Sequence, residues 1–105
     1  MQDTTRIVRV EQTPCFARWL REMADDAALA RIVARIARVQ SGNLGDWKPL
    51  GGGLSEVRVN CGPGYRIYFA LHGTNIIVLL CGGTKGTQWR DIESARELLR
   101  RVAGK

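Results

Sequence analysis

Five side chains in the second half of the sequence could together bind an anion and exchange protons. They are Glu56, Arg58, Arg66, Tyr68 and Lys85. Glu56 and Arg58 are two residues apart before a Gly-Pro-Gly turn at residues 62–64, and Arg66 and Tyr68 are two residues apart after it. Because every second residue of a β-strand points to the same face, two strands joined by this turn would bring these four side chains together. We expect a cluster in which cations hold an anion beside a carboxylate and a phenol.

Alternating apolar residues predict the two strands that would position this cluster. The apolar members are Val57, Val59, Tyr65, Ile67 and Phe69. They alternate with the charged and phenolic residues of the cluster, so the apolar set should face a core and the cluster the opposite side of the sheet.

A third strand is predicted from Ile76 to Cys81, a run that is apolar on both faces and should therefore be central and covered. Gly82 and Gly83 are expected to end this strand. Lys85 would then lie in a loop at its carboxyl end, where backbone amides and a cation can meet an anion.

The remaining predicted elements frame these strands. Thr13 and Pro14 form a helix start, with a hydroxyl cap and a proline in the first turn. A second helix begins at Asp25 and ends at Gly42, and the two helices should pack as a hairpin on one face of the sheet. A first strand at Arg6–Val10, a first helix at Pro14–Met23, a short strand at Trp47–Leu50 and a final helix at Gln88–Val102 complete the prediction. Residues 1–105 thus read as a single α+β domain.

A basic stripe runs along the second predicted helix. Arg31, Arg35 and Arg38 recur at helical spacing, opposite an apolar face made of Leu29, Ile32, Val33, Ile36 and Val39. The stripe could lie against nucleic acid or an acidic peptide, or it could be a solvated outer face. Lys48 could extend this basic surface or simply be exposed.

Composition narrows the class of protein. The chain has 105 residues, of which 45% are apolar and 25% charged, as in a folded protein rather than a disordered or membrane one. Its net charge of +6 favours a polyanion or an acidic protein as partner, although a basic balance can also serve solubility. Three cysteines without a zinc-like Cys/His spacing fit a reducing cytoplasm and predict neither a metal nor a cofactor. No signal peptide or membrane anchor is expected, because the apolar runs are too short.

Several segments, by their order and spacing, resemble the RelE/ParE superfamily of bacterial toxins, in particular its addiction-module killer and phage-derived branch. The resemblance covers nearly the whole chain. It rests on Phe16 with Trp19-Leu20, on residues 42–46 with Lys48, on residues 54–58, on residues 62–69, and on residues 79–85 followed by Gln88 and Asp91-Ile92. It implies a RelE-like fold, with an N-terminal strand and helical hairpin packed on a small antiparallel sheet and a C-terminal helix.

The resemblance also implies a toxin that is neutralised by a small antitoxin encoded beside it, often a helix-turn-helix protein. RelE-like members cleave mRNA, usually at the ribosome and without metal, whereas ParE-like members inhibit DNA gyrase. We therefore expect a metal-independent endoribonuclease that blocks translation in the cytoplasm. A gyrase inhibitor without catalysis, and a non-toxic relic that only binds a partner, are the alternatives.

The same resemblance assigns roles to the cluster. Arg66 falls on the arginine that follows tyrosine in the hairpin motif and contacts the scissile phosphate in RelE-like nucleases. Arg58 and Lys85 resemble further phosphate ligands. Glu56 is a candidate base, or it only orients Arg58 through an ion pair, and Tyr68 donates a proton or positions a neighbour.

Other basic and aromatic residues could add to the RNA-binding surface, and one acid–base residue found in several relatives is absent. The stripe of Arg31, Arg35 and Arg38, together with Lys48, is expected to extend the RNA-binding surface. Trp47 and Trp89 could stack on bases, although packing against the sheet and helices is the expected role of both. Near the C-terminus the chain has no counterpart of the tyrosine or histidine that several relatives use in acid–base chemistry.

Overall fold

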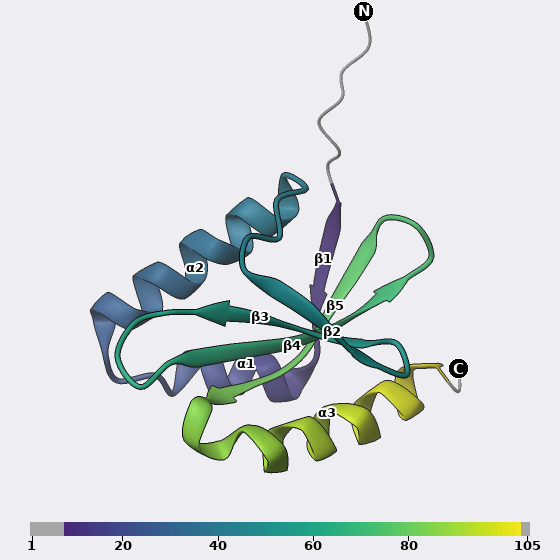
Figure 1. Ribbon diagram of the computed structural model, residues 1–105. Helices are drawn as coiled ribbons and strands as arrows, with labels where there is room; N and C mark the ends of the chain where they lie inside the picture. Colours follow the sequence, from purple (N-terminus) through teal and green to yellow (C-terminus); the bar gives the residue numbers. More distant parts are fainter. Residues whose placement is uncertain (1–7, 104–105) are drawn as a thin grey trace, which may run out of the picture.

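A single mixed β-sheet lies between helices on both faces (Figure 1). The structure is a computed structural model and describes residues 8–103. Its elements, in chain order, are β1 (Arg9–Gln12), α1 (Pro14–Arg21), α2 (Asp26–Gln40), β2 (Trp47–Gly51), β3 (Leu54–Val59), β4 (Tyr65–His72), β5 (Ile76–Thr84), a short 3-10 helix η1 (Lys85–Thr87) and α3 (Gln88–Ala103). Within this part of the chain, no helix is long and apolar enough to span a membrane.

The strands are ordered β1-β5-β4-β3-β2. β1 runs parallel to β5, and every other neighbouring pair is antiparallel. The predicted α+β arrangement of an N-terminal strand, a helical hairpin, a sheet and a C-terminal helix is confirmed, but the sheet is mixed rather than wholly antiparallel. The first strand lies at an edge and covers Arg9–Gln12 instead of Arg6–Val10; Arg6 and Ile7 lie outside the described residues.

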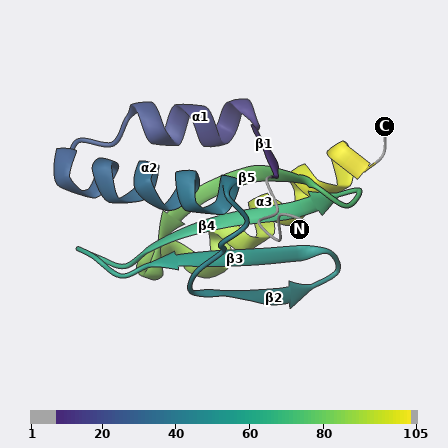
Figure 2. The same cartoon turned by 90° about the horizontal axis from the view of Figure 1, so that it is seen from above.

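Helices α1 and α2 cover one face of the sheet as a hairpin (Figure 2). Phe16, Ile32 and Val39 from these helices are buried in one core cluster with the apolar set of β3 and β4. Thr13 and Asp25 cap the two helices by accepting hydrogen bonds from backbone amides of their first turns. The predicted hairpin is confirmed, although α1 ends at Arg21 and Val33 is 50% exposed rather than buried.

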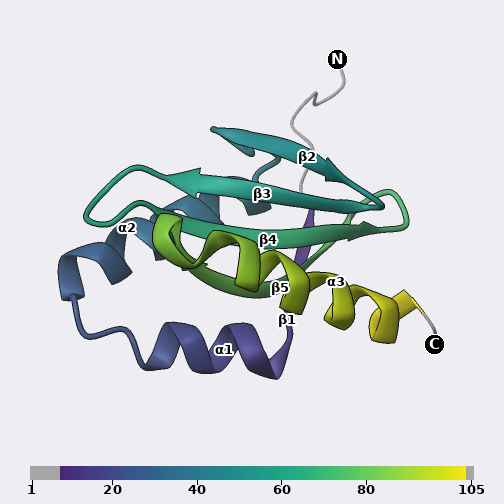
Figure 3. The same cartoon turned by 60° about the horizontal axis from the view of Figure 1, so that its bottom comes forward.

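Helix α3 lies across the opposite face (Figure 3). Its Ala95 is buried in a second core cluster with Leu54 of β3, Tyr68 of β4 and Leu80 of β5. The face on which the predicted cluster lies is therefore not open along its length, because α3 covers the part that is farther from the β3–β4 turn. Strand alternation alone does not reveal which helix covers which face.

Gly82 and Gly83 do not end β5, which continues to Thr84. They are needed because helices approach the strand closely on both faces. A Cβ atom on Gly82 would lie 2.5 Å from Cζ3 of Trp19 in α1, and one on Gly83 would lie 2.7 Å from Cγ of Asp91 in α3. The prediction of a strand break was wrong because glycine serves both to break strands and to admit close neighbours.

A β-bulge distinguishes the centre of β5. Tyr68 pairs with Cys81 and Phe69 with Leu79, which leaves Leu80 as the extra residue. Thr13 satisfies the exposed carbonyl: its hydroxyl donates to Leu80 O at 2.6 Å while its backbone N–H donates to Leu79 O at 3.0 Å. The cap of α1 thus also ties that helix to the sheet.

Candidate functional site

A groove of about 560 Å³ opens at the turn between β3 and β4; we call it the hairpin groove. Arg58, Arg66 and Lys85 line it together with Asp46, Asn60 and the turn residues 61–64. Three of the five side chains of the predicted cluster therefore meet around one open space. Because three cations face a single carboxylate there, the groove is suited to bind an anion.

Strand register positions the two arginines of the hairpin groove. Arg58 of β3 and Arg66 of β4 are cross-strand partners, as the predicted alternation requires. Arg66 is only 9% exposed, and its Nε has no hydrogen-bond partner among the described residues. A guanidinium held in a largely buried position with an unused donor is prepared to bind an oxyanion.

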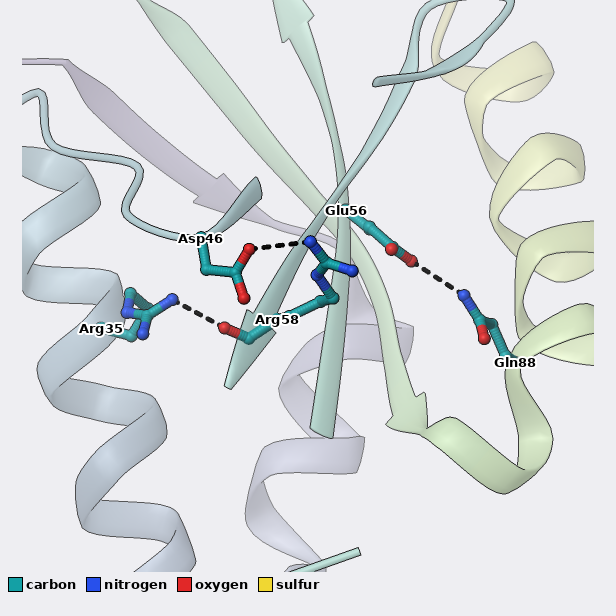
Figure 4. A network of polar contacts seen from close by, with 5 residues as sticks. All are labelled: Arg35, Asp46, Glu56, Arg58 and Gln88. Atoms are coloured by element: carbon teal, nitrogen blue, oxygen red, sulfur yellow. Dashed lines mark hydrogen bonds and ion pairs between the residues drawn. The ribbon is translucent and has the colours of Figure 1, made fainter. Parts of the chain in front are cut away.

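Asp46 orients Arg58 at the other side of the groove. The Arg58 backbone N–H donates to Asp46 O at 2.8 Å, and its Nη2 lies 2.9 Å from Asp46 Oδ1 (Figure 4). Both side chains are partly exposed. The ion-pair partner of Arg58 is thus Asp46, and the alternative in which Glu56 orients Arg58 through an ion pair is wrong.

Lys85 is brought to the groove by the end of β5. Its backbone N–H donates to the carbonyl of Gly64 in the turn at 2.7 Å. Gly64 has φ +82°, which favours glycine, and a Cβ there would lie 3.5 Å from the Lys85 Cβ. The Lys85 side chain is exposed and begins η1 rather than lying in an open loop.

Glu56 and Tyr68 lie two cross-strand pairs farther from the turn than Arg58 and Arg66 and do not line the hairpin groove. They are 1% and 0% exposed. Gln88, the first residue of α3, donates from Nε2 to Glu56 Oε1 at 3.2 Å (Figure 4). Glu56 Oε2 and the Tyr68 hydroxyl have no hydrogen-bond partner among the described residues. The first turn of α3 therefore covers both groups that were predicted to exchange protons.

Burial raises the pKa of Tyr68 well above its ordinary value, and the nearby carboxylates of Glu56 and Asp91 raise it further, against a smaller opposing effect of Arg66. The phenol consequently keeps its proton at neutral pH. It can donate a hydrogen bond but cannot act as a base.

Asp91 closes the site on the side of α3. Its carboxylate accepts a hydrogen bond from the Thr87 hydroxyl and lies directly over Gly83, the cross-strand partner of Arg66. Cys81 donates from Sγ to Asp91 O at 3.4 Å. Asp91 thus fixes the start of α3 against β5 beside the cluster.

The basic stripe on α2 lines a second groove, of about 250 Å³, which we call the helix groove. Arg31, Ala34, Arg35, Arg38, Val59 and Asn60 surround it. Arg31 and Arg38 are exposed as predicted, whereas Arg35 is half-buried and donates from Nη1 to Arg58 O at 2.8 Å (Figure 4). The structure therefore brings the stripe beside the end of β3 instead of leaving it as a separate outer face.

Three other predicted residues lie apart from both grooves. Lys48 is exposed on β2 as the cross-strand partner of Glu56. The ring centroid of Trp47 lies 6.3 Å from that of Phe69, but the residue is 42% exposed, so Trp47 packs against the sheet only in part. Trp89 is 72% exposed in the first turn of α3, so the prediction that it packs against the sheet was wrong.

The sequence did not single out Asp46, Gln88 or Asp91 as site residues. Asp46 belongs to an irregular loop whose path no periodicity reveals. Gln88 and Asp91 are three residues apart at the start of the predicted final helix, a spacing that places both on one face. That spacing was the available signal for the last two. Within residues 8–103, no group of three His, Cys, Asp or Glu could hold a metal ion.

Known proteins resemble this chain in both sequence and fold. The family described as "Phage derived protein Gp49-like (DUF891)" matches residues 18–100. An uncharacterized protein of Haemophilus influenzae is 41% identical over 91 residues, which cover 87% of this chain and 92% of that protein.

A solved structure shares the fold. A chain of the toxin–antitoxin complex RelBE2 from Mycobacterium tuberculosis superposes with a TM-score of 0.61 and 20% identity, over 80% of this chain and 98% of that one. This likeness confirms the RelE-like fold that the sequence predicted. The family match confirms the predicted phage-derived branch, and the chain belongs to the phage-derived Gp49-like family.

Proposed function

We propose that this protein is the toxin of a toxin–antitoxin pair and cleaves mRNA in the cytoplasm, thereby blocking translation. The observation that carries the proposal is the convergence of Arg58, Arg66 and Lys85 on the hairpin groove, where Asp46 is the one carboxylate among the described residues that line it. The Gp49-like family and the RelE-like fold support a toxin. In the proposed reaction the three cations bind the scissile phosphate and stabilise the negative charge that builds on its oxygens.

The proposed reaction is a transesterification within the RNA, in which a base of the chain takes one proton and water protonates the leaving oxygen. The 2′-hydroxyl of the RNA attacks the neighbouring phosphorus; the P–O2′ bond forms while the P–O5′ bond breaks. A base takes the 2′-hydroxyl proton, and the departing 5′-oxygen takes up a proton. The products are a 2′,3′-cyclic phosphate and a 5′-hydroxyl end.

Asp46 is the base in this proposal, in place of Glu56. It is the carboxylate that lines the hairpin groove, and its Oδ1 contact with Arg58 holds it beside the place where the phosphate would bind. Glu56 and Tyr68, covered by α3, become positioning residues. Glu56 and Arg66 act in opposite directions on the Tyr68 phenol, which lies buried within the field of both.

The variant Asp46→Asn is expected to slow RNA cleavage by about 100- to 10,000-fold, because the amide cannot accept the proton. Its amide oxygen can still accept the hydrogen bond of Arg58, so the groove keeps its shape. The rate is measured in a cell-free translation extract supplied with a transcript that the wild type cuts. If Asp46 only oriented Arg58, Asp46→Asn would retain most of the activity and Asp46→Ala would lose it.

An antitoxin is the proposed protein partner. The solved structure that shares the fold is a toxin–antitoxin complex, which supports a similar pairing for this chain. We expect a helix-turn-helix protein encoded in the adjacent gene. mRNA is the proposed substrate, bound on the ribosome or free, and Lys48 is proposed to add to the cationic surface around it.

A second candidate, a toxin that binds DNA gyrase without catalysis, is favoured by one observation. Both groups that the sequence suggested for proton transfer are buried under α3 and lie outside the hairpin groove. A protein that only binds would not need them in contact with a substrate.

Induced expression separates the two candidates. We expect growth arrest, new transcript ends in primer extension and normal plasmid supercoiling, with growth restored by co-expression of the neighbouring gene. Intact transcripts together with relaxed plasmid DNA would reject the nuclease and support the gyrase inhibitor. Unaffected growth in cells that contain the folded protein would indicate a relic.

A further inference from the structure

The hairpin groove and the helix groove lie on opposite sides of the end of β3. The first opens on the side that α3 covers farther along the sheet; the second lies between α2 and the end of β3. Val59, which lines the helix groove, belongs to the core face under α1 and α2. Two cationic grooves therefore flank one hairpin.

Asn60 joins the two grooves, because it is the residue that lines both. It is exposed and immediately follows β3. Arg58 links the grooves from within: its side chain lines the hairpin groove, while its carbonyl accepts the hydrogen bond of Arg35 from the helix groove. A linear polymer that extends from one groove across Asn60 would therefore reach the other groove.

The cations of the helix groove are free to bind an anion. Within residues 8–103, none of the three arginines takes part in an ion pair with a carboxylate. Arg35 is fixed by Arg58 O and by the loop, where a Cβ on Gly45 would lie 3.3 Å from its Cζ. Arg31 and Arg38, one on each side of Arg35 along the helix, project into solvent. Arg35 thus has a fixed position in the helix groove, while Arg31 and Arg38 supply the cations that can bind a ligand.

We propose that the helix groove is a second phosphate-binding site, and that a single-stranded RNA passes over Asn60 with one phosphate in each groove. This inference rests on the proposed function, because it takes the hairpin groove as the site of the scissile phosphate. An RNA strand fits better than an acidic peptide since its phosphates recur at short, regular intervals and Asn60 borders both grooves. The helix groove binds the strand and does not take part in bond cleavage.

The double variant Arg31→Gln/Arg38→Gln tests the second site. Affinity is measured by fluorescence anisotropy with 2′-O-methyl RNA strands of ten and of three nucleotides, which cannot be cut, at several salt concentrations. For the longer strand, the slope of log affinity against log salt is expected to become shallower by about 0.7, because the phosphate contact in the helix groove is lost. For the shorter strand, which we expect to bind in the hairpin groove alone, the slope stays at the wild-type value.

Arg18→Gln/Arg21→Gln is the matched control, since it removes the same charge from exposed positions of α1 that line neither groove. It is expected to leave both slopes unchanged. An equal fall in this control, or an unchanged slope in Arg31→Gln/Arg38→Gln, would overturn the second site. Because the strands are not cut, the slopes decide this question even if the wild type cleaves no transcript, a result that would reject the proposed function alone.

Discussion

Replacement of Arg66 by alanine is expected to lower RNA cleavage by about 100- to 1000-fold and to abolish growth arrest. Arg66 is the largely buried cation of the hairpin groove, and its Nε has no partner among the described residues. For an oxyanion bound there, a fixed donor of the protein takes the place of water. In such a site the removal of a single donor has a large effect on catalysis. Growth curves and primer extension after induction measure the two effects.

Arg66→Ala also removes a largely buried side chain from the sheet, so its folding must be checked by circular dichroism. Two further variants separate catalysis from stability. Lys85→Gln changes an exposed residue of the same groove and should lower cleavage without affecting the fold. Arg66→Lys keeps the charge but loses the planar pair of donors, and we expect it to recover only part of the activity.

Full toxicity in a folded Arg66→Ala protein would exclude Arg66 from the phosphate site. Arg18→Gln serves as the control for loss of positive charge.

Replacement of Gly82 by alanine is expected to destabilise the protein by about 1–3 kcal/mol. The added Cβ would lie 2.5 Å from Cζ3 and 2.6 Å from Cδ2 of Trp19, too close for any carbon contact. The indole cannot yield easily because it packs between Phe16, at a centroid distance of 5.5 Å, and Tyr65, at 6.2 Å. The free energy of unfolding, measured in urea, gives the size of the effect.

Gly86→Ala is the matched control for Gly82→Ala. A Cβ at Gly86 would have Thr84 Oγ1, at 3.7 Å, as its nearest neighbour, and its φ lies outside the left-handed region. We expect its stability to stay within about 0.5 kcal/mol of the wild type. Equal stability of both variants would contradict the close contact between α1 and β5.

Strand alternation was enough to predict which side chains share a face. Glu56, Arg58, Arg66 and Tyr68 lie together because the period of two is a local property of extended backbone. The cover provided by α3 depends on contacts between residues such as Gln88 and Glu56, which are 32 positions apart. Local patterns carry no information on such contacts, so the burial of Glu56 and Tyr68 was not predictable.

Irregular backbone accounts for the other differences. Asp46 lies in a loop, and its approach to Arg58 depends on the path of that loop rather than on any repeat. The bulge at Leu80 shifts the register by one residue without a visible signal in the apolar run. Gly82 and Gly83 were misread because the sequence shows the glycines but not the side chains of Trp19 and Asp91 that occupy the space above them.

The central proposal is that the hairpin groove holds an RNA phosphate while the RNA's own 2′-hydroxyl displaces the 5′-oxygen. Sequencing of RNA ends from cells that express the wild type or Arg66→Ala tests it most directly. The proposal predicts 5′-hydroxyl ends downstream of each cut and 2′,3′-cyclic phosphates upstream, in wild-type samples alone. Cuts that carry 5′-phosphates, or an unchanged pattern of cuts with Arg66→Ala, would contradict it.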